Sequence, residues 1–534
     1  MRRFWLILIT VLMCALAACP GKTPDNPDYW KSALSRANNP TEKITILSNL
    51  RKQKPQDAAF LPLLHDILAN EKSPDVRVAA VRILADMKNP SSLGPLQNAL
   101  APKASSARTR DLNRAIVEAL VALKAPETEP VFLEMLKTKD NFTLFPAIEG
   151  LVQLRSKQAV PFLLEMLDNP AIPPNEQMKY IAALGQLADP SAIPTLEKKL
   201  FTLHLENEAA LALFRLGNPA ADAMLLILQE KNTGLIKWAV GNKISSQMLM
   251  VNATSVLGDM QDLRAENILI SKLTPKNNSF ESLRLQQQAV HALGRMRSTK
   301  ATAALSRVVL EQDVLLRNLC VLALAQTGDK TALPALKKAA SIGEFDERLR
   351  ALTGIALLGG EDELAFFNKQ MDSERAAFGK DQARFREECG NNSCDAQIKR
   401  LGEQRMEALN QLKDVLEAGS KCGEKEACWT EVLTDASASN SLKRQRAAFF
   451  LGRSKNPQYI AVLGKQLMDA DLELRMQSLL GISWLVRDNP QAAQQAKTLI
   501  QPMQQQMDEE RSSTQKAGIR DEMWRVLWTL QNLP

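Results

Sequence analysis

The sequence predicts an all-α solenoid, which is a stack of short helix pairs, and three observations support this fold class. A helical phrase recurs along the chain, as in Ile83–Met87, Ala119–Leu123 and Ala292–Met296. Its second residue is found at Leu84, Leu120, Leu151, Leu184, Leu213, Leu257, Leu293, Leu324, Leu357, Leu451 and Leu485. Most steps between these markers are 29 to 36 residues long, within the range typical of solenoid repeats. Aromatic residues make up only 5% of the chain and strand-favouring runs are scarce, so sheets are not expected.

Length and composition are those of a large folded protein. The chain has 534 residues, of which 45% are hydrophobic and 24% are charged, a balance that supports a packed core and excludes a disordered chain. A repeat of about 33 residues cannot bury its apolar face alone, so it stacks on its neighbours. Such stacking creates an extended binding surface, whereas a closed catalytic barrel is not expected.

The N-terminus has the features of an exported lipoprotein. Residues 1–18 combine Arg2 and Arg3 with an apolar segment, which is typical of a secretory signal peptide. The junction Leu16–Cys19 resembles the lipobox of bacterial lipoproteins, and this resemblance implies cleavage before Cys19 and attachment of palmitate-type acyl chains to it. Two or more chains hold a protein firmly on a membrane. An ordinary signal peptide that is cleaved elsewhere is the alternative.

The lipobox resemblance also suggests a location. The second mature residue is Pro20, not the aspartate that marks inner-membrane retention, so we expect the outer membrane of the bacterial envelope, facing the periplasm. Removal of Arg2 and Arg3 lowers the net charge from +7 to +5. This small charge gives no electrostatic footprint of a nucleic-acid binder, and no nucleic-acid partner is expected.

The chain divides into five expected segments. The signal peptide (1–18) is followed by a lipidated, proline-containing tether (19–39), repeats over 40–360, an insertion over 361–429, and C-terminal repeats with a cap over 430–534. Asn-Pro or Asp-Pro dipeptides punctuate the repeats, as at Asn89-Pro90 and Asp189-Pro190. Proline disfavours the α conformation of the preceding residue, so these dipeptides end one helix and free the chain to start another.

The repeats resemble HEAT repeats, a family of right-handed helical solenoids. The resemblance implies a ladder in which an acidic residue of the turn inside each repeat and an arginine six positions later stack between neighbouring units. The pairs that match are Glu71 with Arg77, Glu311 with Arg317, Glu344 with Arg350, and Asp469 with Arg475. Asp168 has no arginine at the matching place, so the ladder is expected to be interrupted in mid-chain. Armadillo-like or tetratricopeptide stacking is the alternative.

The insertion predicts an antiparallel helical hairpin. Apolar residues from Leu364 to Phe385 and from Ile398 to Val415 lie at helical spacings on either side of the polar segment 389–394. A helix from Asp395 to Ala418 places Cys394 and Cys422 about 40 Å apart, beyond the reach of a disulfide. We therefore expect Cys389 to pair with Cys394 and Cys422 with Cys428, and the same distance disfavours a four-cysteine zinc site. Cys320 is expected to be a buried free thiol.

The sequence contains no recognisable catalytic, cofactor or metal site. It has no phosphate-binding loop, and His65, His204 and His291 lie in three different repeats without ligand spacing. Basic residues form local clusters, which are either solvated helix faces or a surface for an acidic partner or lipid headgroups. Arg444 and Arg446 are the candidate partner surface among the clustered residues Arg108, Arg110, Arg114, Arg295, Arg297, Lys443, Arg444 and Arg446.

These observations predict a non-catalytic protein-binding scaffold, lipid-anchored in the bacterial cell envelope, with envelope proteins as partners, no cofactor, and the hairpin as a docking arm. An envelope enzyme or enzyme regulator is the alternative, and a deep pocket that holds clustered ionisable side chains would favour it. A mechanical spacer without a specific partner is the third possibility.

Overall fold

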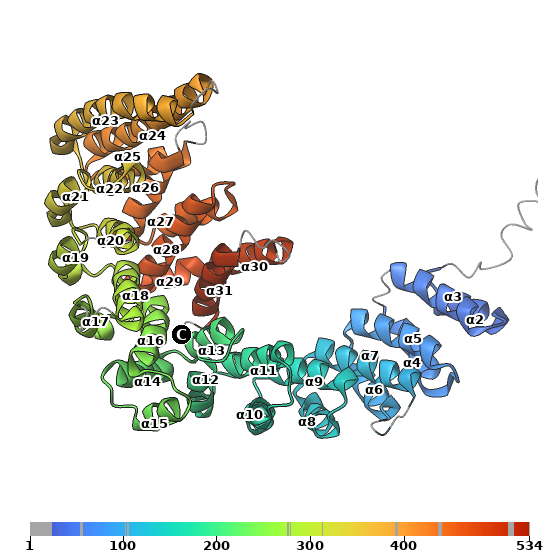
Figure 1. Cartoon of the computed structure of the whole chain (residues 1–534). Coiled ribbons are helices and arrows are strands. Elements are labelled where there is room, and N and C mark those ends of the chain that lie inside the picture. The colour runs from blue at the N-terminus through green and yellow to red at the C-terminus, as the bar shows by residue number, and fades with distance from the viewer. Residues whose placement is uncertain are drawn as a thin grey trace, which may run out of the picture. The chain divides into compact units, whose positions relative to one another are not determined.

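The computed structural model describes residues 24–532 except 54–56, 102, 104–105, 275–276, 278, 312, 390–393, 436–440 and 511–516. Every regular element within these ranges is a helix. The all-α fold class and the solenoid of helix pairs expected from the sequence are therefore confirmed. The chain divides into two compact units, residues 1–195 and 196–534, and each is described by itself (Figure 1).

The first unit is an open stack of helix pairs. Its helices are α2 (Pro27–Arg36), α3 (Pro40–Lys52), α4 (Leu61–Asn70), α5 (Pro74–Met87), α6 (Leu93–Ala99), α7 (Ala107–Leu123), α8 (Glu129–Thr138), α9 (Asn141–Gln153), α10 (Val160–Asp168) and α11 (Pro174–Leu187). The second helices of successive pairs, α3, α5, α7, α9 and α11, pack side by side. Marker leucines such as Leu84 and Leu120 are fully buried between them.

The second unit has three parts. Repeats continue through α12 (Ile193–Lys199), α13 (Glu206–Leu216), α14 (Asn218–Leu228), α15 (Thr233–Gly241), α16 (Ser246–Met260), α17 (Glu266–Lys272), α18 (Phe280–Met296), α19 (Thr302–Val308), α20 (Val314–Thr327), α21 (Leu333–Ala339) and α22 (Phe345–Leu358). The hairpin consists of α23 (Glu361–Glu388) and α24 (Asp395–Cys422). The C-terminal part contains α25 (Glu426–Thr434), α26 (Ser441–Arg453), α27 (Tyr459–Lys465), α28 (Leu472–Asp488), α29 (Pro490–Ala496), α30 (Ile500–Glu509) and α31 (Ala517–Gln531).

A one-turn 3-10 helix precedes many of the first helices. These turns are η1 (Ala58–Phe60), η2 (Pro90–Ser92), η3 (Pro126–Thr128), η4 (Lys157–Ala159), η5 (Pro190–Ala192), η6 (Leu263–Ala265), η7 (Thr299–Ala301) and η8 (Lys330–Ala332), and η9 (Gln466–Met468) and η10 (Lys497–Leu499) follow α27 and α29. At η2 the side chain of Asn89 caps the turn by accepting a hydrogen bond from the backbone N–H of Ser91. The Asn-Pro dipeptide thus starts the new helix as well as ending the old one.

The repeats share a chain reversal that follows the marker leucine. Four residues after nine of the eleven markers the backbone has a positive φ, at Lys88, Lys124, Arg155, Ala188, Gly217, Gln261, Arg297, Gly328 and Lys455. A left-handed residue at this position ends the helix and turns the chain toward the next repeat. Only Gly217 and Gly328 are glycines, so seven of the nine reversals carry no glycine in the sequence.

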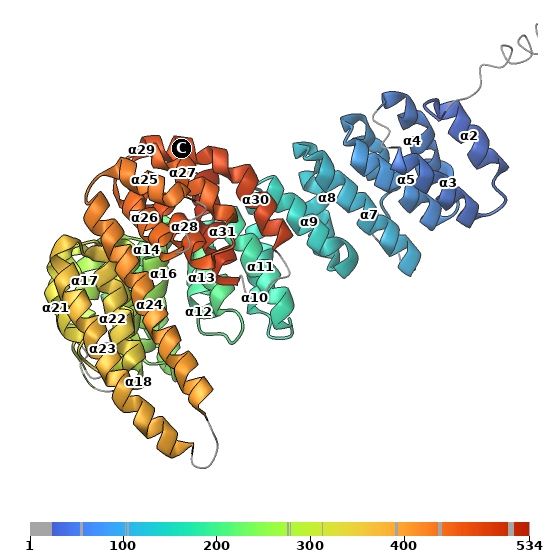
Figure 2. The same cartoon turned by 90° about the horizontal axis from the view of Figure 1, so that it is seen from above.

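The second unit closes on itself. Helices α13 to α22 form one arm, the hairpin follows, and α25 to α31 return as a second arm that brings α31 against α13 (Figure 1). Seen from above, the distal part of the hairpin extends beyond the neighbouring helices (Figure 2). The sequence predicted an extended binding surface along the stack, whereas in this unit part of that surface faces an interior between two arms.

Candidate functional site

A buried ionic cluster joins the two arms of the second unit. Arg295 of α18 is 6% exposed, and its Nη2 lies 2.9 Å from Oε2 of Glu522 in α31. Arg525 of α31 contacts the same carboxylate at 3.0 Å and Asp259 of α16 at 2.8 Å. Burial raises the pKa of Glu522, but the guanidinium groups of Arg295 and Arg525 outweigh burial and hold the pKa below its usual value. We call Asp259, Arg295, Glu522 and Arg525 the closure cluster.

Aromatic and backbone contacts extend this junction. The indole of Trp484 in α28 is fully buried and donates a hydrogen bond of 2.8 Å to the carbonyl of Arg295. Arg487 donates to the carbonyl of Met296 at 3.0 Å. Trp524 and Trp528 stack on one another, and the guanidinium of Arg215 in α13 lies 3.6 Å from the Trp524 ring centroid. The two tryptophans therefore join the arms, in addition to ending the last repeat.

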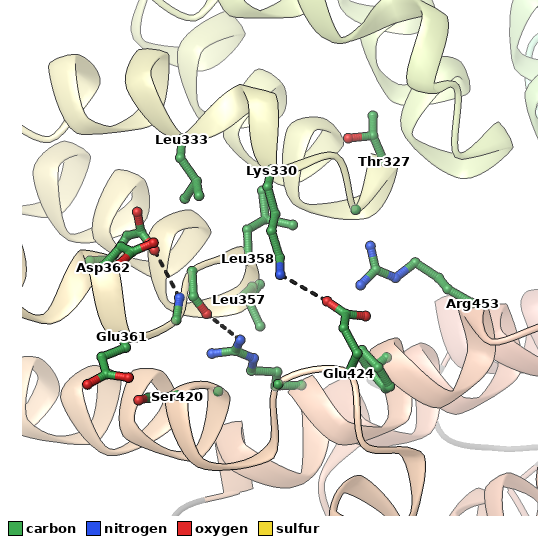
Figure 3. A pocket seen from close by; sticks show the side chains of 18 of the residues that line it. Thr327, Lys330, Leu333, Leu357, Leu358, Glu361, Asp362, Ser420, Glu424 and Arg453 are labelled. Atoms are coloured by element: carbon green, nitrogen blue, oxygen red, sulfur yellow. Dashed lines mark hydrogen bonds and ion pairs between the residues drawn. The ribbon is translucent and has the colours of Figure 1, made fainter.

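A cavity of about 760 Å³ lies between the two arms and the base of the hairpin. It is formed by the loop after α20, the end of α22, the start of α23, the end of α24 and one face of α26 (Figure 3). Its charged lining residues are Arg297, Lys330, Glu361, Asp362, Glu363, Glu424, Glu426, Arg446 and Arg453. We call this space the interarm cavity.

Arg446 is one wall of the interarm cavity and is a structural residue. It is 6% exposed, and its guanidinium donates to the carbonyls of Ala356, Gly359 and Val415. These contacts hold the end of α22 to α24. Burial, with the neighbouring charge of Arg453 in support, lowers the pKa of Arg446 to about 9. The predicted partner surface is therefore corrected at Arg446, because a buried guanidinium that binds three carbonyls cannot receive a partner.

Arg444 is also engaged within the chain. Its guanidinium donates to the carbonyl of Leu433 at 3.3 Å and pairs with Asp469 at 2.7 Å. The prediction of a partner surface at Arg444 is corrected for the same reason. The remaining predicted clusters are divided: Arg295 and Arg297 lie in the junction between the arms, whereas Arg108 and Arg114 have half-exposed or exposed side chains that pair with Asp75 and Glu118.

The inter-repeat ladder exists, with partners that differ from the predicted ones. Arg317 donates to the carbonyl of Glu311 at 3.0 Å and pairs with Glu347 of the next repeat at 3.0 Å. Arg475 pairs with Glu510 at 2.8 Å, with both groups buried. Arg317 thus binds the turn of its own repeat through a carbonyl and the next repeat through a carboxylate, and Arg475 makes a carboxylate contact of the second kind.

The same rule corrects the other predicted pairs. Glu71 is held by Lys43 of the preceding repeat at 2.7 Å, and Arg77 donates to the carbonyl of Leu68. Asp469 pairs with Arg444, as described above. Arg350 is exposed, and the ladder position in that repeat is taken by Arg348, which pairs with Glu374 of the hairpin at 2.5 Å. These ion pairs join neighbouring repeats, as the ladder implied, but with other partners, because the turn places the carboxylate beside the preceding unit.

The two cysteine pairs that the sequence suggested lie at the two ends of α24. Cys389 is joined to Cys394 at the tip, and Cys422 to Cys428 where the chain leaves α24. The two helices pack closely at Gly402, since a side chain there would overlap the ring of Phe378. Cys320 is buried and free, and burial raises the pKa of its thiol well above the usual value.

The histidines considered in the sequence show no arrangement typical of a catalytic or metal site. The imidazole of His65 is 3.0 Å from the hydroxyl of Ser92, and burial lowers its pKa. His204 has a positive φ of 69° in the loop before α13. Within the described ranges, no group of three or more His, Cys, Asp or Glu residues is arranged to hold a metal ion. Cys19 and the lipobox lie outside the described residues.

Among the described helices, no single one has both the length and the apolar character to cross a bilayer. Taken together, α13 and α14 reach both thresholds, but the pair is bent by 119°.

Comparison with known proteins identifies a repeat family over part of the chain. Residues 98–174 match the family model of HEAT repeats. This match covers α7 to α10 and agrees with the resemblance noted in the sequence. No curated protein matches the sequence significantly.

Solved structures similar to the chain include karyopherins. The karyopherin Kap121p bound to the extreme C-terminus of the protein phosphatase Cdc14p matches with 13% identity and a TM-score of 0.46, over 95% of this chain and 62% of that one. Kap121p bound to the SUMO protease Ulp1p matches with 14% identity and a TM-score of 0.45, over 90% and 59%. Kap95p in its complex with RanGDP matches with 11% identity and a TM-score of 0.45, over 94% and 76%. The chain thus spans about three fifths of the length of the Kap121p chains.

Proposed function

We propose that this protein is a non-catalytic protein-binding scaffold that is lipid-anchored in the bacterial cell envelope. The observation that carries the binding role is an exposed apolar face on α20. Val314 and Leu315 are 49% and 56% exposed, and Leu322 is 41% exposed. Positions seven or eight residues apart share one side of a helix, so the three side chains form one apolar stripe. Exposed apolar surface of this kind is typical of a protein contact site.

Envelope location is supported by the sequence and by the cysteines. Leu16–Cys19 has the form of a lipobox, and an export route leads to a compartment in which disulfides persist. Both bridges of the hairpin suit that compartment. A lipid at Cys19 confines the chain to a membrane surface, where the local concentration of membrane-bound partners is high.

Site-specific photo-crosslinking at Leu315 in native envelopes tests the binding role. A crosslinker at Leu315 is expected to capture one or a few defined envelope proteins, and a crosslinker at the exposed residue Glu134 of the first unit is the matched control. Identical capture profiles at the two positions would contradict a specific contact on α20.

The anchor has a separate test. We expect radiolabelled palmitate to be incorporated into the native chain and lost in Cys19→Ala, with the protein moving from the outer-membrane fraction to the soluble periplasmic fraction. Unchanged labelling in the variant would show that the acyl chains are not on Cys19.

The interarm cavity is the feature that favours an enzyme or an enzyme regulator instead. Its lining holds clustered ionisable side chains, but it includes no histidine or cysteine among the described residues. The hydroxyls of Thr327, Ser420 and Ser454 in the lining therefore have no imidazole beside them to act as a general base. The lining is better suited to binding than to nucleophilic catalysis.

A further inference from the structure

Two guanidinium groups in the interarm cavity have donors without acceptors. Nε of Arg453 is buried and has no hydrogen-bond acceptor among the residues that the structure describes. The same holds for Nε and Nη1 of Arg297, whose Nη1 lies 3.7 Å from Asp488. A buried polar group without a partner is costly, and more so when it is charged. Since these three atoms are covered by protein atoms, a ligand in the cavity would meet the two guanidinium groups through their other nitrogens and would compensate their charge.

Electrostatics point to the same need. Burial, with the neighbouring charge of Arg297 in support, lowers the pKa of Arg453 to about 10. Burial also lowers the pKa of Arg297; the charge of Asp488 opposes this shift only in part, and the charge of Arg487 adds to it. At neutral pH both groups remain charged, so each is a cation in a site that disfavours its charge. An anion bound between them would restore the missing interaction.

The fold holds Arg453 in place by shape. Its guanidinium lies 4.4 Å from the ring centroid of Phe449 on the same helix. On the other side it lies against Gly328, where an added Cβ would be 1.1 Å from Nη1. Gly328 also has a φ of 72°, which favours glycine. Figure 3 shows Arg453 pointing into the cavity toward Lys330 and Glu424.

Two of the acidic residues in the lining already form ion pairs with lysines. Glu424 pairs with Lys330 at 2.9 Å, and Glu363 pairs with Lys337 at 3.0 Å. Glu361 and Asp362, by contrast, are exposed and lie on the opposite side of the cavity from Arg453 (Figure 3). Glu361 and Asp362 therefore lie across the cavity from Arg453, whereas Glu424, which lies beside Arg453, is paired with Lys330.

We propose that the interarm cavity binds a short peptide segment whose free carboxylate is held by Arg453 and Arg297, while an amino or ammonium group faces Glu361 and Asp362. A single carboxylate fits two guanidinium groups through charge-assisted hydrogen bonds. A phosphate dianion fits less well because the carboxylates of the lining repel its second charge. The volume of about 760 Å³ lies in the range of small-ligand sites.

Titration calorimetry on the full-length chain tests the ligand class. The probes are the tripeptide Ala-Lys-Ala with a free C-terminal carboxylate, the same tripeptide with an amidated C-terminus, and inorganic phosphate. We expect the free acid to bind, and the amide to bind at least tenfold more weakly, because it lacks the anionic oxygens. Phosphate is expected to bind more weakly than the free acid and to compete with it.

Variants locate the binding in the cavity. Arg453→Gln is expected to weaken binding of the free acid at least tenfold, whereas Arg307→Gln, an exposed arginine of α19 outside the lining, should leave it unchanged. Ser420→Phe places a ring in the cavity from α24 without altering either arginine, and should also abolish binding. Circular dichroism shows whether each variant is folded. If Arg453→Gln is unfolded, Ser420→Phe alone tests the location of the site.

Four results would overturn the proposal. Three are no heat of binding with the free acid, equal binding of the free acid and the amide, and unchanged binding in Ser420→Phe. The fourth is tighter binding of phosphate than of the free acid, since the site would then be a phosphate site. The choice of a peptide as the ligand rests on the proposed scaffold function, but the cavity proposal and the scaffold proposal can be refuted independently. Crosslinking at Leu315 tests the scaffold without involving the cavity.

Discussion

The closure cluster offers the most direct test of the ring that the second unit forms. Glu522 is 2% exposed, and its carboxylate receives hydrogen bonds from Arg295 at 2.9 and 3.1 Å and from Arg525 at 3.0 Å. Glu522→Gln keeps the shape of the side chain, removes the negative charge and replaces one acceptor oxygen with a donor. The substitution therefore leaves Arg295 buried with fewer acceptors and less charge compensation.

The size of the effect follows from the contacts that remain. Removing one partner of a buried ion pair destabilises a protein by about 3–5 kcal/mol. Asp259 still lies 3.4 Å from Nε of Arg295 and 2.8 Å from Arg525, so partial compensation persists. We expect a loss at the lower end of the range, about 3 kcal/mol, which corresponds to roughly a 150-fold change in an equilibrium constant.

Hydrogen exchange measured by mass spectrometry resolves where the loss occurs. In Glu522→Gln, the amides of α31 and of the facing helices α16 and α18 should exchange up to about 150-fold faster, because opening of the junction becomes less costly. Helices of the first unit should be unchanged. Arg375→Gln is the matched control, because Arg375 pairs with Asp372 on the exposed surface of the hairpin, where an ion pair contributes little.

A double-mutant cycle decides whether the pair itself is responsible. If Arg295→Met and Glu522→Met together destabilise less than the sum of the single changes, the two side chains interact directly. Additive losses, or exchange rates in α16 and α31 that match the native protein, would refute the closure of the two arms through this cluster.

Three further predictions concern other buried positions. Arg446→Gln should lower the free energy of unfolding in urea by about 3 kcal/mol, because three carbonyls lose a charged donor; a loss below 1 kcal/mol would contradict that role. Burial raises the pKa of Glu197 from 4.5 to about 7 in the folded chain. The folded state therefore favours the neutral carboxyl, and its stability should fall as pH rises from about 4.5 toward 7. Glu197→Gln should accordingly raise the melting temperature at pH 8 but not at pH 4. At Gly452 an added Cβ would lie 2.4 Å from the backbone of Gly481, so Gly452→Ala should lower the free energy of unfolding in urea by about 1–3 kcal/mol. Gly518 has open space around the position of a Cβ, so Gly518→Ala is the control and should cost less than about 1 kcal/mol.

The periodicity of the sequence was sufficient to predict the helix pairs, because burial of the marker leucines is decided locally. Leu84, Leu120 and Leu184 are each fully buried in the seam between second helices. The hairpin was predictable for the same reason, since its apolar positions follow a helical period. The chain reversals were not, because Lys124 and Ala188 adopt a positive φ that their side chains do not signal.

The candidate site was not predictable, because its residues come from distant parts of the sequence. Arg295 and Glu522 are 227 residues apart in sequence, and no periodic pattern indicates that the repeats containing them meet. Arg444 and Arg446 form a basic cluster in the sequence that is typical of a solvated face. In the structure Arg446 is buried because its guanidinium donates hydrogen bonds to carbonyls at the end of α22. These carbonyls lie 87 and 90 residues away in the sequence.

The interarm cavity depends on both the hairpin and the C-terminal arm. Arg453 comes from α26, its neighbour Gly328 from the end of α20, and Ser420 from the end of α24. Arg297 lies next to the closure cluster, two residues after Arg295. Any change that opens the junction should therefore also move Arg297 away from Arg453 and weaken binding of a carboxylate. Glu522→Gln is thus expected to reduce affinity for the free-acid tripeptide, although Glu522 is absent from the lining. Unchanged affinity in that variant, together with faster exchange in α31, would mean that the two arms hold the cavity without the closure cluster.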